Sequence, residues 1–373
     1  MTKRVLDLAP LLRDRHTKVV VTCGSGGVGK TTIAAAMALW AADAGRKVAV
    51  LTIDPAKRLA QALGLEALDN DPRRVDIELA DPGGELWAMM LDTRRTFDEM
   101  VMHHSTAQRA EAILANPFYK VISTSFSGTQ EYMAMEKLST LAATNQFDLI
   151  VVDTPPSRSA LDFLDAPQRL SAFLDGRMIR LLSVPSRGVM KVLGAGFTLF
   201  SKAVSTVLGG QMLNDAAQFV RLFEEMFGGF RERAQATYEL LREPGTAFVV
   251  VSICEADSLR EASYFADRLR AERMPLAGLI LNRTHPPLAR LPLATAEVAA
   301  EKLERTAPLT AAVLGIHADR LATRAAELHM RARFDRVHTD LPIIEVATLA
   351  SDAHDVPALR EIGLRLTAFS PVA

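Results

Sequence analysis

The sequence is poor in cysteine, in net charge and in long apolar runs, and each shortage excludes a class of protein. Only Cys23 and Cys254 are cysteines among 373 residues, so one chain supplies neither a disulfide framework nor a four-cysteine zinc site. The formal charge of −1 provides no overall positive charge to hold nucleic acid or an anionic membrane. We therefore expect a protein of the reducing cytoplasm, with neither zinc nor a nucleic-acid partner.

Long hydrophobic segments are also missing. No window of about 18 uncharged apolar residues occurs, which argues against a membrane span. Charged residues between Lys3 and Arg15 interrupt the apolar residues near the N-terminus, so no signal-peptide core is expected there. Transient contact with a membrane surface remains open. With 49% apolar residues over 373 positions, the chain can bury a large core, as one α/β domain with insertions or as two domains.

Nearly continuous apolar runs predict buried parallel strands. They are Val19 to Cys23, Val48 to Ile53, Leu149 to Val152, Phe248 to Ile253, Leu276 to Leu281 and Ile343 to Val346. Helical stretches lie between several of them, such as Thr31 to Ala44 before Gly45 and Ser258 to Arg273 before Pro275. This alternation predicts an α/β fold with a doubly wound, mostly parallel sheet.

Two longer segments interrupt the alternation. Residues at approximately 95–144 and 165–243 have helical patterns without strands between them. We expect a single domain over residues 1–373, with a helical subdomain formed by these two insertions at one edge of the sheet.

A glycine-rich loop follows the first predicted strand and opens the first predicted helix, which is the context that a phosphate-binding loop requires. Its residues are Gly24, Ser25, Gly26, Gly27, Val28, Gly29, Lys30 and Thr31, followed by Thr32. Backbone N–H groups of such a loop surround phosphates, Lys30 would reach the β and γ oxygens, and Thr31 would place a hydroxyl on Mg²⁺. A glycine-rich turn without a ligand would not require the Lys-Thr pair in this register.

Two aspartates follow predicted strands, and the ends of parallel strands meet at one edge of a sheet. Asp153 fits the carboxylate that holds the magnesium shell, through water, whereas Asp54 fits a group that orients or deprotonates the attacking water. These roles could be exchanged. Alternatively, each aspartate caps the helix after its strand.

This combination of motifs resembles the deviant-P-loop ATPases, of the SIMIBI type of P-loop NTPase, and especially the ArsA (arsenite-pump) and GET-type (tail-anchored-protein-targeting) ATPases. The matching residues are Gly26 to Thr32, Asp54-Pro55-Ala56, Leu86 to Met89, Asp153 to Pro156, Glu255 to Glu261 and Asn282. The resemblance implies a dimeric ATPase that uses ATP and Mg²⁺. It further implies that Asp54 activates water, Asp153 is associated with magnesium, Asn282 contacts adenine, and the loop after Val346 forms a wall of the base pocket.

Ser25 departs from the family pattern, because the deviant loop normally carries a lysine there that reaches the partner's phosphates. A cation delivered in trans can be worth several orders of magnitude in rate. A homodimer should therefore be slow unless Arg58, Arg158 or another cation substitutes, whereas a paralogue bearing the lysine would complete this chain's site in a heterodimer. Alternatively, Ser25 simply fits the loop.

Two further departures concern metals and the first switch. The Cys-x-x-Cys zinc motif of many GET-type ATPases is absent, and two cysteines are too few for arsenite, which prefers several thiolates. In addition, Lys57 to Gln61 replaces the family's polar continuation after Asp54-Pro55-Ala56, so we expect contacts to the γ-phosphate that differ from those of the family.

The segment from Met178 to Phe230 is rich in apolar residues with basic residues between them. In the GET-type relatives the corresponding region shields a client's transmembrane helix, so one interpretation is a groove for a hydrophobic protein. The alternatives are packing within the helical subdomain or onto a second subunit, and contact with a membrane surface.

Three functions follow from these patterns. The first is an ATPase whose cycle opens and closes a dimer and exposes a surface for a hydrophobic protein or membrane partner. The second is a weakly hydrolysing regulatory subunit that a lysine-bearing paralogue completes. The third is a partition or positioning ATPase, which the near-neutral charge disfavours.

Overall fold

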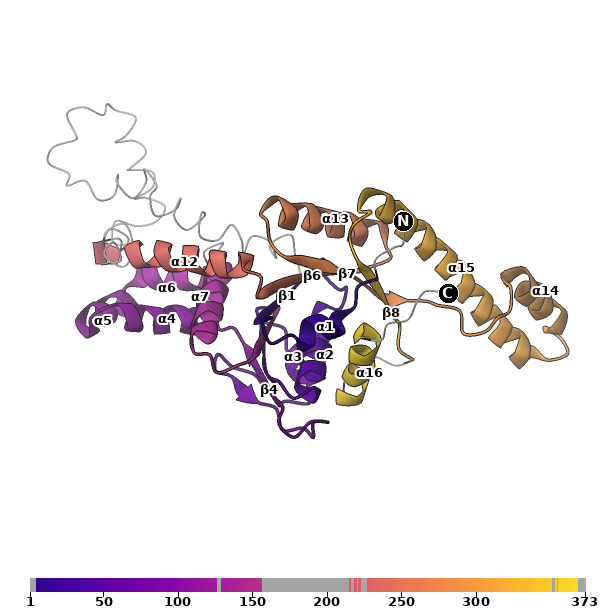
Figure 1. The fold of residues 1–373 in the computed structure, drawn as a ribbon, viewed down its shortest axis with the longest axis horizontal. Helices are drawn as coiled ribbons and strands as arrows, with labels where there is room; N and C mark the ends of the chain where they lie inside the picture. The colour runs from indigo at the N-terminus through magenta and orange to yellow at the C-terminus, as the bar shows by residue number, and fades with distance from the viewer. Residues whose placement is uncertain are drawn as a thin grey trace, which may run out of the picture. The chain divides into compact units, whose positions relative to one another are not determined.

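A single mixed sheet organises the described part of the chain. The computed structural model describes residues 5–125, 129–155, 215, 218, 219, 221, 222, 227–350, 353 and 355–367. Within these ranges the sheet has eight strands in the order β3-β4-β2-β5-β1-β6-β7-β8 (Figure 1). The strands are β1 (Val19–Cys23), β2 (Lys47–Thr52), β3 (Arg73–Arg74), β4 (Glu85–Met90), β5 (Leu149–Asp153), β6 (Thr246–Ile253), β7 (Leu276–Thr284) and β8 (Ile343–Ala347).

Parallel pairing dominates the sheet. β1 pairs in parallel with β5 and β6, β5 pairs with β2, and β7 lies in parallel between β6 and β8, whereas β3 and β4 form an antiparallel edge. The predicted mostly parallel α/β sheet is thus confirmed, and each of the six predicted runs is a strand. After β1 the chain continues to β2, which lies in the sheet on the β5 side of β1. After β5 it continues to β6, which lies on the opposite side of β1. The loop after β1 therefore lies at the topological switch point of the sheet.

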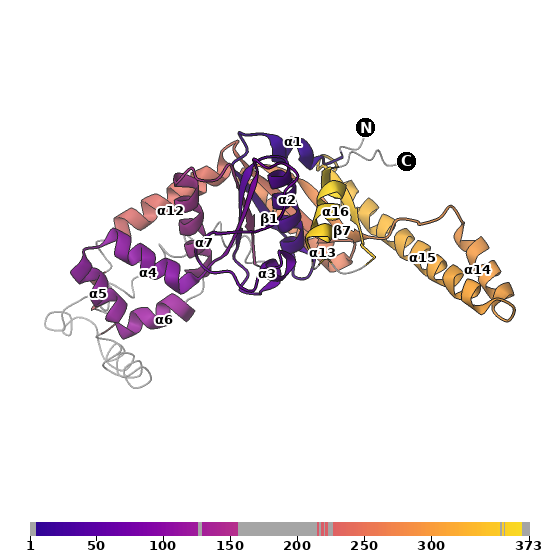
Figure 2. The same ribbon diagram turned by 90° about the horizontal axis from the view of Figure 1, so that it is seen from below.

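Helices cover both faces of the sheet, as the doubly wound prediction requires. α2 and α16 pack against each other on one face, and α13 packs on β6 and β7 on the other (Figure 1). α14 packs along α15, and the two extend away from the sheet (Figure 2). These helices are α1 (Leu8–Arg13), α2 (Lys30–Asp43), α3 (Arg58–Ala62), α13 (Ala256–Ala271), α14 (Leu293–Leu303), α15 (Pro308–Val337) and α16 (Val356–Thr367).

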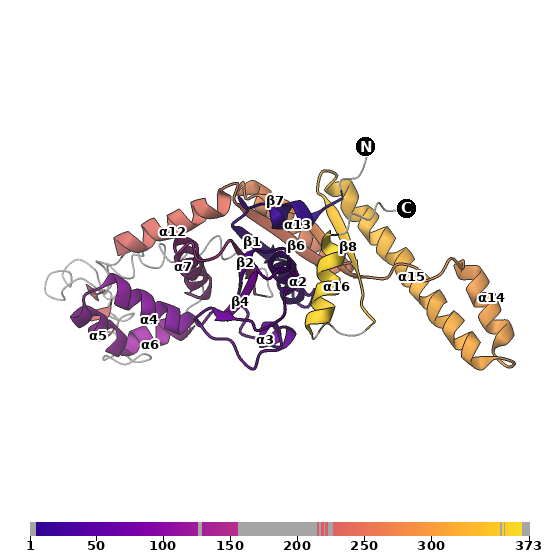
Figure 3. The ribbon, with the colours of Figure 1, turned by 60° about the horizontal axis from the view of Figure 1, so that its bottom comes forward.

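The described residues divide into two compact units. The first comprises those within Met1–Met89, Gln146–Ala160 and Leu241–Ala373, and the second those within Met90–Asn145 and Leu161–Leu240. In the second unit α4 packs against α5, α6 and α7 (Figure 3). The helices of this unit are α4 (Thr93–His104), α5 (Ala107–Ala115), α6 (Pro117–Ser125), α7 (Thr129–Ala143) and α12 (Phe227–Arg242), whose last residues belong to the first unit.

Several predictions fall outside the described residues. Most of the apolar segment from Met178 to Phe230 lies there, as does Arg158. The predicted bounds of the helical subdomain therefore stay a prediction. Among the helices that the structure describes, none combines the length and apolar character needed to cross a bilayer.

Arg46 joins three segments at the edge of the sheet opposite the glycine-rich loop. Its side chain is buried, and its guanidinium donates hydrogen bonds to the carbonyl oxygens of Leu12 at 2.8 Å, Thr17 at 2.7 Å and Asp148 at 2.6 Å. These carbonyls lie at the end of α1, before β1 and before β5. One side chain thus satisfies three backbone acceptors that burial would otherwise leave without a partner.

Replacing Arg46 with methionine should therefore destabilise the first unit. We expect Arg46→Met to lower the free energy of unfolding by about 3 kcal/mol, because charged hydrogen bonds are lost and carbonyls are left buried. Urea unfolding followed by circular dichroism measures this change. Arg15→Met, at an exposed position of the same region, is the matched control and should shift stability by no more than about 0.5 kcal/mol. Equal effects of the two variants on stability would contradict this role of Arg46 as the donor to the three carbonyls.

Candidate nucleotide site

The glycine-rich loop between β1 and α2 lies very close to neighbouring backbone and side chains. Gly29 is the N-cap of α2 and has a φ of 93°. A Cβ atom on Gly29 would lie 2.4 Å from Nδ2 of Asn282, and one on Gly24 would lie 2.1 Å from the carbonyl oxygen of Val251. Only glycine fits at these two positions, so the loop backbone is free to turn its N–H groups inward.

Lys30 begins α2 and folds back over the loop. Its ammonium donates to the carbonyl oxygens of Gly24 at 3.0 Å and Ser25 at 2.9 Å, and its side chain is buried. Burial lowers the pKa of Lys30, although the carboxylates of Asp153 and Asp54 act in the opposite direction. The amine is therefore held inside the loop by carbonyl oxygens, where it can exchange these acceptors for the oxygens of a phosphate.

Asp153 ends β5 and is completely buried. Its Oδ2 accepts hydrogen bonds from the hydroxyls of Thr31 at 2.7 Å and Thr52 at 2.9 Å, which begin α2 and end β2. Burial raises the pKa of Asp153 to about 6, against the two hydroxyls and Lys30, which lower it. One carboxylate oxygen thus joins three elements of the site.

The oxygen atoms around Asp153 suit Mg²⁺, which prefers oxygen ligands. Because the Thr31 hydroxyl donates its hydrogen to Asp153, the lone pairs of Thr31 Oγ1 remain available to a cation. Among the described residues, Oδ1 of Asp153 is buried without a hydrogen-bond partner, and such an atom calls for a cation or an ordered water. The residues present therefore fit the predicted metal.

Asp54 comes two residues after the end of β2, the strand that pairs with β5 and whose Thr52 lies opposite Asp153. Its Oδ1 accepts a hydrogen bond from the N–H of Ala56 at 3.0 Å, and its Oδ2 lies 3.7 Å from the guanidinium of Arg58. The N-cap of α3 is Lys57, so Asp54 closes a turn before this helix and does not cap it. The carboxylate is buried at the carboxyl edge of the sheet.

Asn282 lies inside β7, which continues to Thr284, beyond the end at Leu281 that the apolar run predicted. Its Nδ2 donates a hydrogen bond of 2.8 Å to the carbonyl oxygen of Val28, so it contacts the glycine-rich loop directly. Asn282 also lines a cavity of about 400 Å³ that begins at the loop and continues along the ends of β7 and β8. The other lining residues are Gly29, Thr32, Arg58, Gln61, Ala62, Arg283, Val346, Ala347, Thr348, Leu349, Ala353 and Ile362.

The structure thus brings the predicted residues to one edge of the sheet, and it adds others. The loop after Val346, which the resemblance predicts to be a wall of the base pocket, lines this cavity together with Thr32. Gln61 lies in the first-switch segment that the sequence singled out, whereas Arg283 and Ile362 had no sequence signal of their own. Only Arg283 could have been found by its position, immediately after Asn282.

A family model described as "Anion-transporting ATPase" matches residues 17–290, which is most of the chain. The chain belongs to the anion-transporting ATPase family. The match includes the glycine-rich loop, Asp54, Asp153 and Asn282, and it confirms the resemblance to ArsA and GET-type ATPases. The protein is accordingly an ATPase.

Named relatives agree with this family. The chain is 26% identical over 284 residues to an ATPase GET3 of Malassezia globosa, covering 75% of this chain and 77% of the relative. It is 27% identical over 290 residues to a putative arsenical pump-driving ATPase of Halobacterium salinarum, covering 74% and 42%. An ATPase BagA of Mycobacterium tuberculosis is 25% identical over 363 residues, covering 91% of this chain and 89% of the relative.

The two cysteines are buried thiols in this anion-transporting ATPase family member. Burial raises the pKa of Cys23 and the pKa of Cys254 to about 12 each. Burial thus disfavours the thiolate forms that would bind a soft metal or arsenite.

The bond from Asn282 to Val28 predicts a role in shaping the loop. We expect Asn282→Ala to weaken ATP binding roughly tenfold, and Asn282→Asp to weaken it further, because a carboxylate would face the Val28 carbonyl. Isothermal titration calorimetry with ATP and Mg²⁺ measures the dissociation constant of each variant. If Asn282 contacts only the base, both variants should leave the affinity for tripolyphosphate at its wild-type value.

Proposed function

We propose that the loop after β1, with Asp54 and Asp153, is the site where this ATPase binds and hydrolyses ATP. The observation that carries the proposal is the hydrogen bond from Thr31 to Asp153. It places a hydroxyl and a buried carboxylate side by side at the first turn of α2, directly after a loop that requires glycine at positions 24 and 29. The positive end of the helix dipole at the same turn adds to the attraction for phosphate.

The residues divide the chemistry among them. Loop N–H groups and Lys30 would hold the β- and γ-phosphates, and Thr31 and Asp153 would hold Mg²⁺, Asp153 through water. When bound, Mg²⁺ supplies positive charge against the phosphate oxygens. Asp54 would orient a water molecule toward the γ-phosphorus and accept its proton as the bond to the β–γ bridging oxygen breaks, which releases ADP and phosphate.

Arg58 is our candidate for the cation that Ser25 cannot supply. Ser25 is buried and uncharged, whereas the guanidinium of Arg58 lies beside Asp54 and lines the same cavity as Gly29 and Thr32. A cation in the same chain would not require a partner's lysine. In this proposal Arg58 reaches the γ-phosphate when ATP is bound.

The resemblance to ArsA and GET-type ATPases further supports a dimer that opens and closes with the ATP cycle and acts on a hydrophobic protein or membrane partner. Ser25 supports a second candidate, a regulatory subunit that a lysine-bearing paralogue completes. The two differ in the turnover of the isolated chain, because only the second requires another protein for rapid hydrolysis.

Substitutions at the phosphate loop and at Asp54 test the site itself. We expect Lys30→Ala to abolish measurable hydrolysis and weaken ATP binding, and Asp54→Asn to lower kcat by about 10²–10⁴-fold while retaining binding. Phosphate release with Mg²⁺ or with EDTA, together with ATP titration, measures both properties. Lys302→Ala, at an exposed position of α14, is the control and should keep wild-type turnover. Unchanged turnover in Lys30→Ala would place hydrolysis elsewhere.

The source of the missing cation is tested by a pair of substitutions. If Arg58 supplies it, Arg58→Ala should lower kcat on the order of 10²-fold or more with ATP affinity kept, and Ser25→Lys should add little. If a paralogue supplies it, the wild type should be slow, Arg58→Ala should be no slower, and Ser25→Lys should accelerate turnover. Single-turnover kinetics at saturating ATP, with the mass of the complex measured in parallel, distinguish these outcomes.

A further inference from the structure

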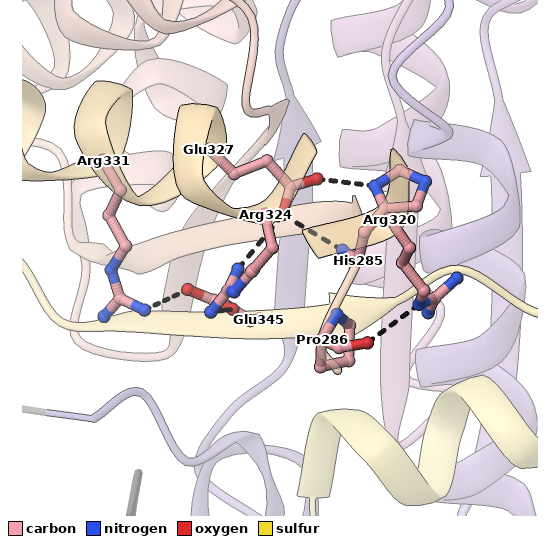
Figure 4. Close-up of polar contacts among 7 residues, drawn as sticks. All are labelled: His285, Pro286, Arg320, Arg324, Glu327, Arg331 and Glu345. Atoms are coloured by element: carbon pink, nitrogen blue, oxygen red, sulfur yellow. Dashed lines mark hydrogen bonds and ion pairs between the residues drawn. The ribbon is translucent and has the colours of Figure 1, made fainter. Parts of the chain in front are cut away.

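A network of charged side chains connects α15 to the carboxyl ends of β7 and β8 (Figure 4). Glu327 of α15 is buried, and its carboxylate accepts a hydrogen bond from the backbone N–H of His285 at 3.0 Å. The Nδ1 atom of the same histidine lies 2.6 Å from the other carboxylate oxygen. Arg320, two turns earlier on α15, donates to the carbonyl oxygen of Pro286 at 2.8 Å. The segment that follows β7 is therefore attached to α15 at three points.

β8 is attached to the same helix through Glu345. One oxygen of Glu345 lies 2.7 Å from Arg324, and the other is paired with Arg331. Arg324 also donates to Glu327 at 3.2 Å, so its guanidinium bridges the carboxylates of α15 and β8. Burial disfavours the charged form of Arg324, but the two glutamates outweigh burial and raise its pKa above the ordinary value. Because Arg324 and Glu327 are largely buried, solvent and salt screen these pairs little.

The two strand ends held by this network also form the far wall of the cavity described above. Glu345 directly precedes Val346, the first β8 residue that lines the cavity, and His285 follows the lining residue Arg283 by two positions. Thr348, also in the wall, donates a backbone hydrogen bond of 2.9 Å to Thr284, which connects the two strand ends. No described residue of α15 lines the cavity itself.

A role in stability alone is a weak explanation of this arrangement. Desolvation largely cancels the attraction within a buried ion pair, and an apolar contact of similar volume is often as stable. Fixed ion pairs instead determine geometry, because a guanidinium that bridges two carboxylates permits few relative positions of the elements that carry them. Here those elements are α15 and the two strand ends of the wall.

We propose that α15 sets the position of the base-side wall of the nucleotide site, with Arg324 and Glu327 as positioning residues for ATP binding. This inference rests on the proposed function, because it takes the cavity beyond the phosphate loop as the place of the nucleoside. The network would affect binding of the nucleoside end of ATP. Binding of the phosphate end, which the loop and α2 hold, would not depend on it. That difference separates a positioning role from a general loss of structure.

The test compares ATP with tripolyphosphate, which has the phosphate chain but no nucleoside. We expect Arg324→Gln and Glu327→Gln to raise the Kd for ATP roughly tenfold, within the range of known couplings between sites. Their Kd for tripolyphosphate should stay within about twofold of wild type. Arg333→Gln, the same substitution at an exposed position of α15, is the matched control and should change neither constant. Arg324→Lys keeps the charge but lacks the two separate nitrogens that reach Glu327 and Glu345, so it should have an intermediate effect. This variant replaces Arg324→Gln in the test if the glutamine variant does not fold.

A second measurement follows the local stability of the cavity wall directly. Hydrogen exchange of Val346 to Leu349 should be faster in Arg324→Gln than in Arg333→Gln before nucleotide is added, because the end of β8 loses its attachment to α15. The proposal is overturned if both ligands weaken equally, if neither weakens, or if exchange at the wall is unchanged. Lys30→Ala checks the proposed function separately: if it leaves the binding of ATP and of tripolyphosphate intact, the phosphate site itself is wrongly assigned.

Discussion

The site depends on the parallel pairing of β1, β5 and β2, which brings three chain segments to one edge of the sheet. Asp153 ends β5 between the loop after β1 and the end of β2, and its buried carboxylate accepts hydrogen bonds from Thr31 and Thr52. Burial without a full positive partner is unfavourable for a carboxylate and raises the pKa of Asp153. The fold tolerates this cost at the position where a magnesium ion would offset it. Buried groups with shifted pKa values are concentrated at functional sites.

The parts of this arrangement that the sequence predicts are those with local signals. Strands β1 and β5 are buried over their whole length, so their apolar residues are continuous and recognisable. The glycine-rich loop is recognisable because its backbone requires glycine at fixed positions, as at Gly24 and Gly29. By contrast, β3 consists of two exposed arginines that pair with β4 at the edge of the sheet, and two residues carry no periodicity to detect.

Long-range polar contacts leave no such signal. Asn282 meets Val28 across 254 positions, and His285 meets Glu327 across 42, so neither spacing indicates that the side chains are neighbours. The family resemblance predicts an adenine contact for Asn282, but not its hydrogen bond to the loop carbonyl of Val28. The helix α15 was missed for a related reason. Its buried residues are few and include Glu327, so the apolar stripe by which helices are recognised is weak.

The family match ends at residue 290, before α14 begins, whereas the cavity continues to β8 and to the residues that follow it. The phosphate end of the site therefore lies within the part of the chain that the family model describes, and much of the opposite wall lies beyond it. Near their ends β7 and β8 are joined by the pairing of Thr284 with Ala347 and by the backbone hydrogen bond from Thr348 to Thr284. Attachment to α15 through Glu345 and His285 adds support from outside the sheet, so the geometry of one end of the site depends on a helix that contributes nothing to its lining.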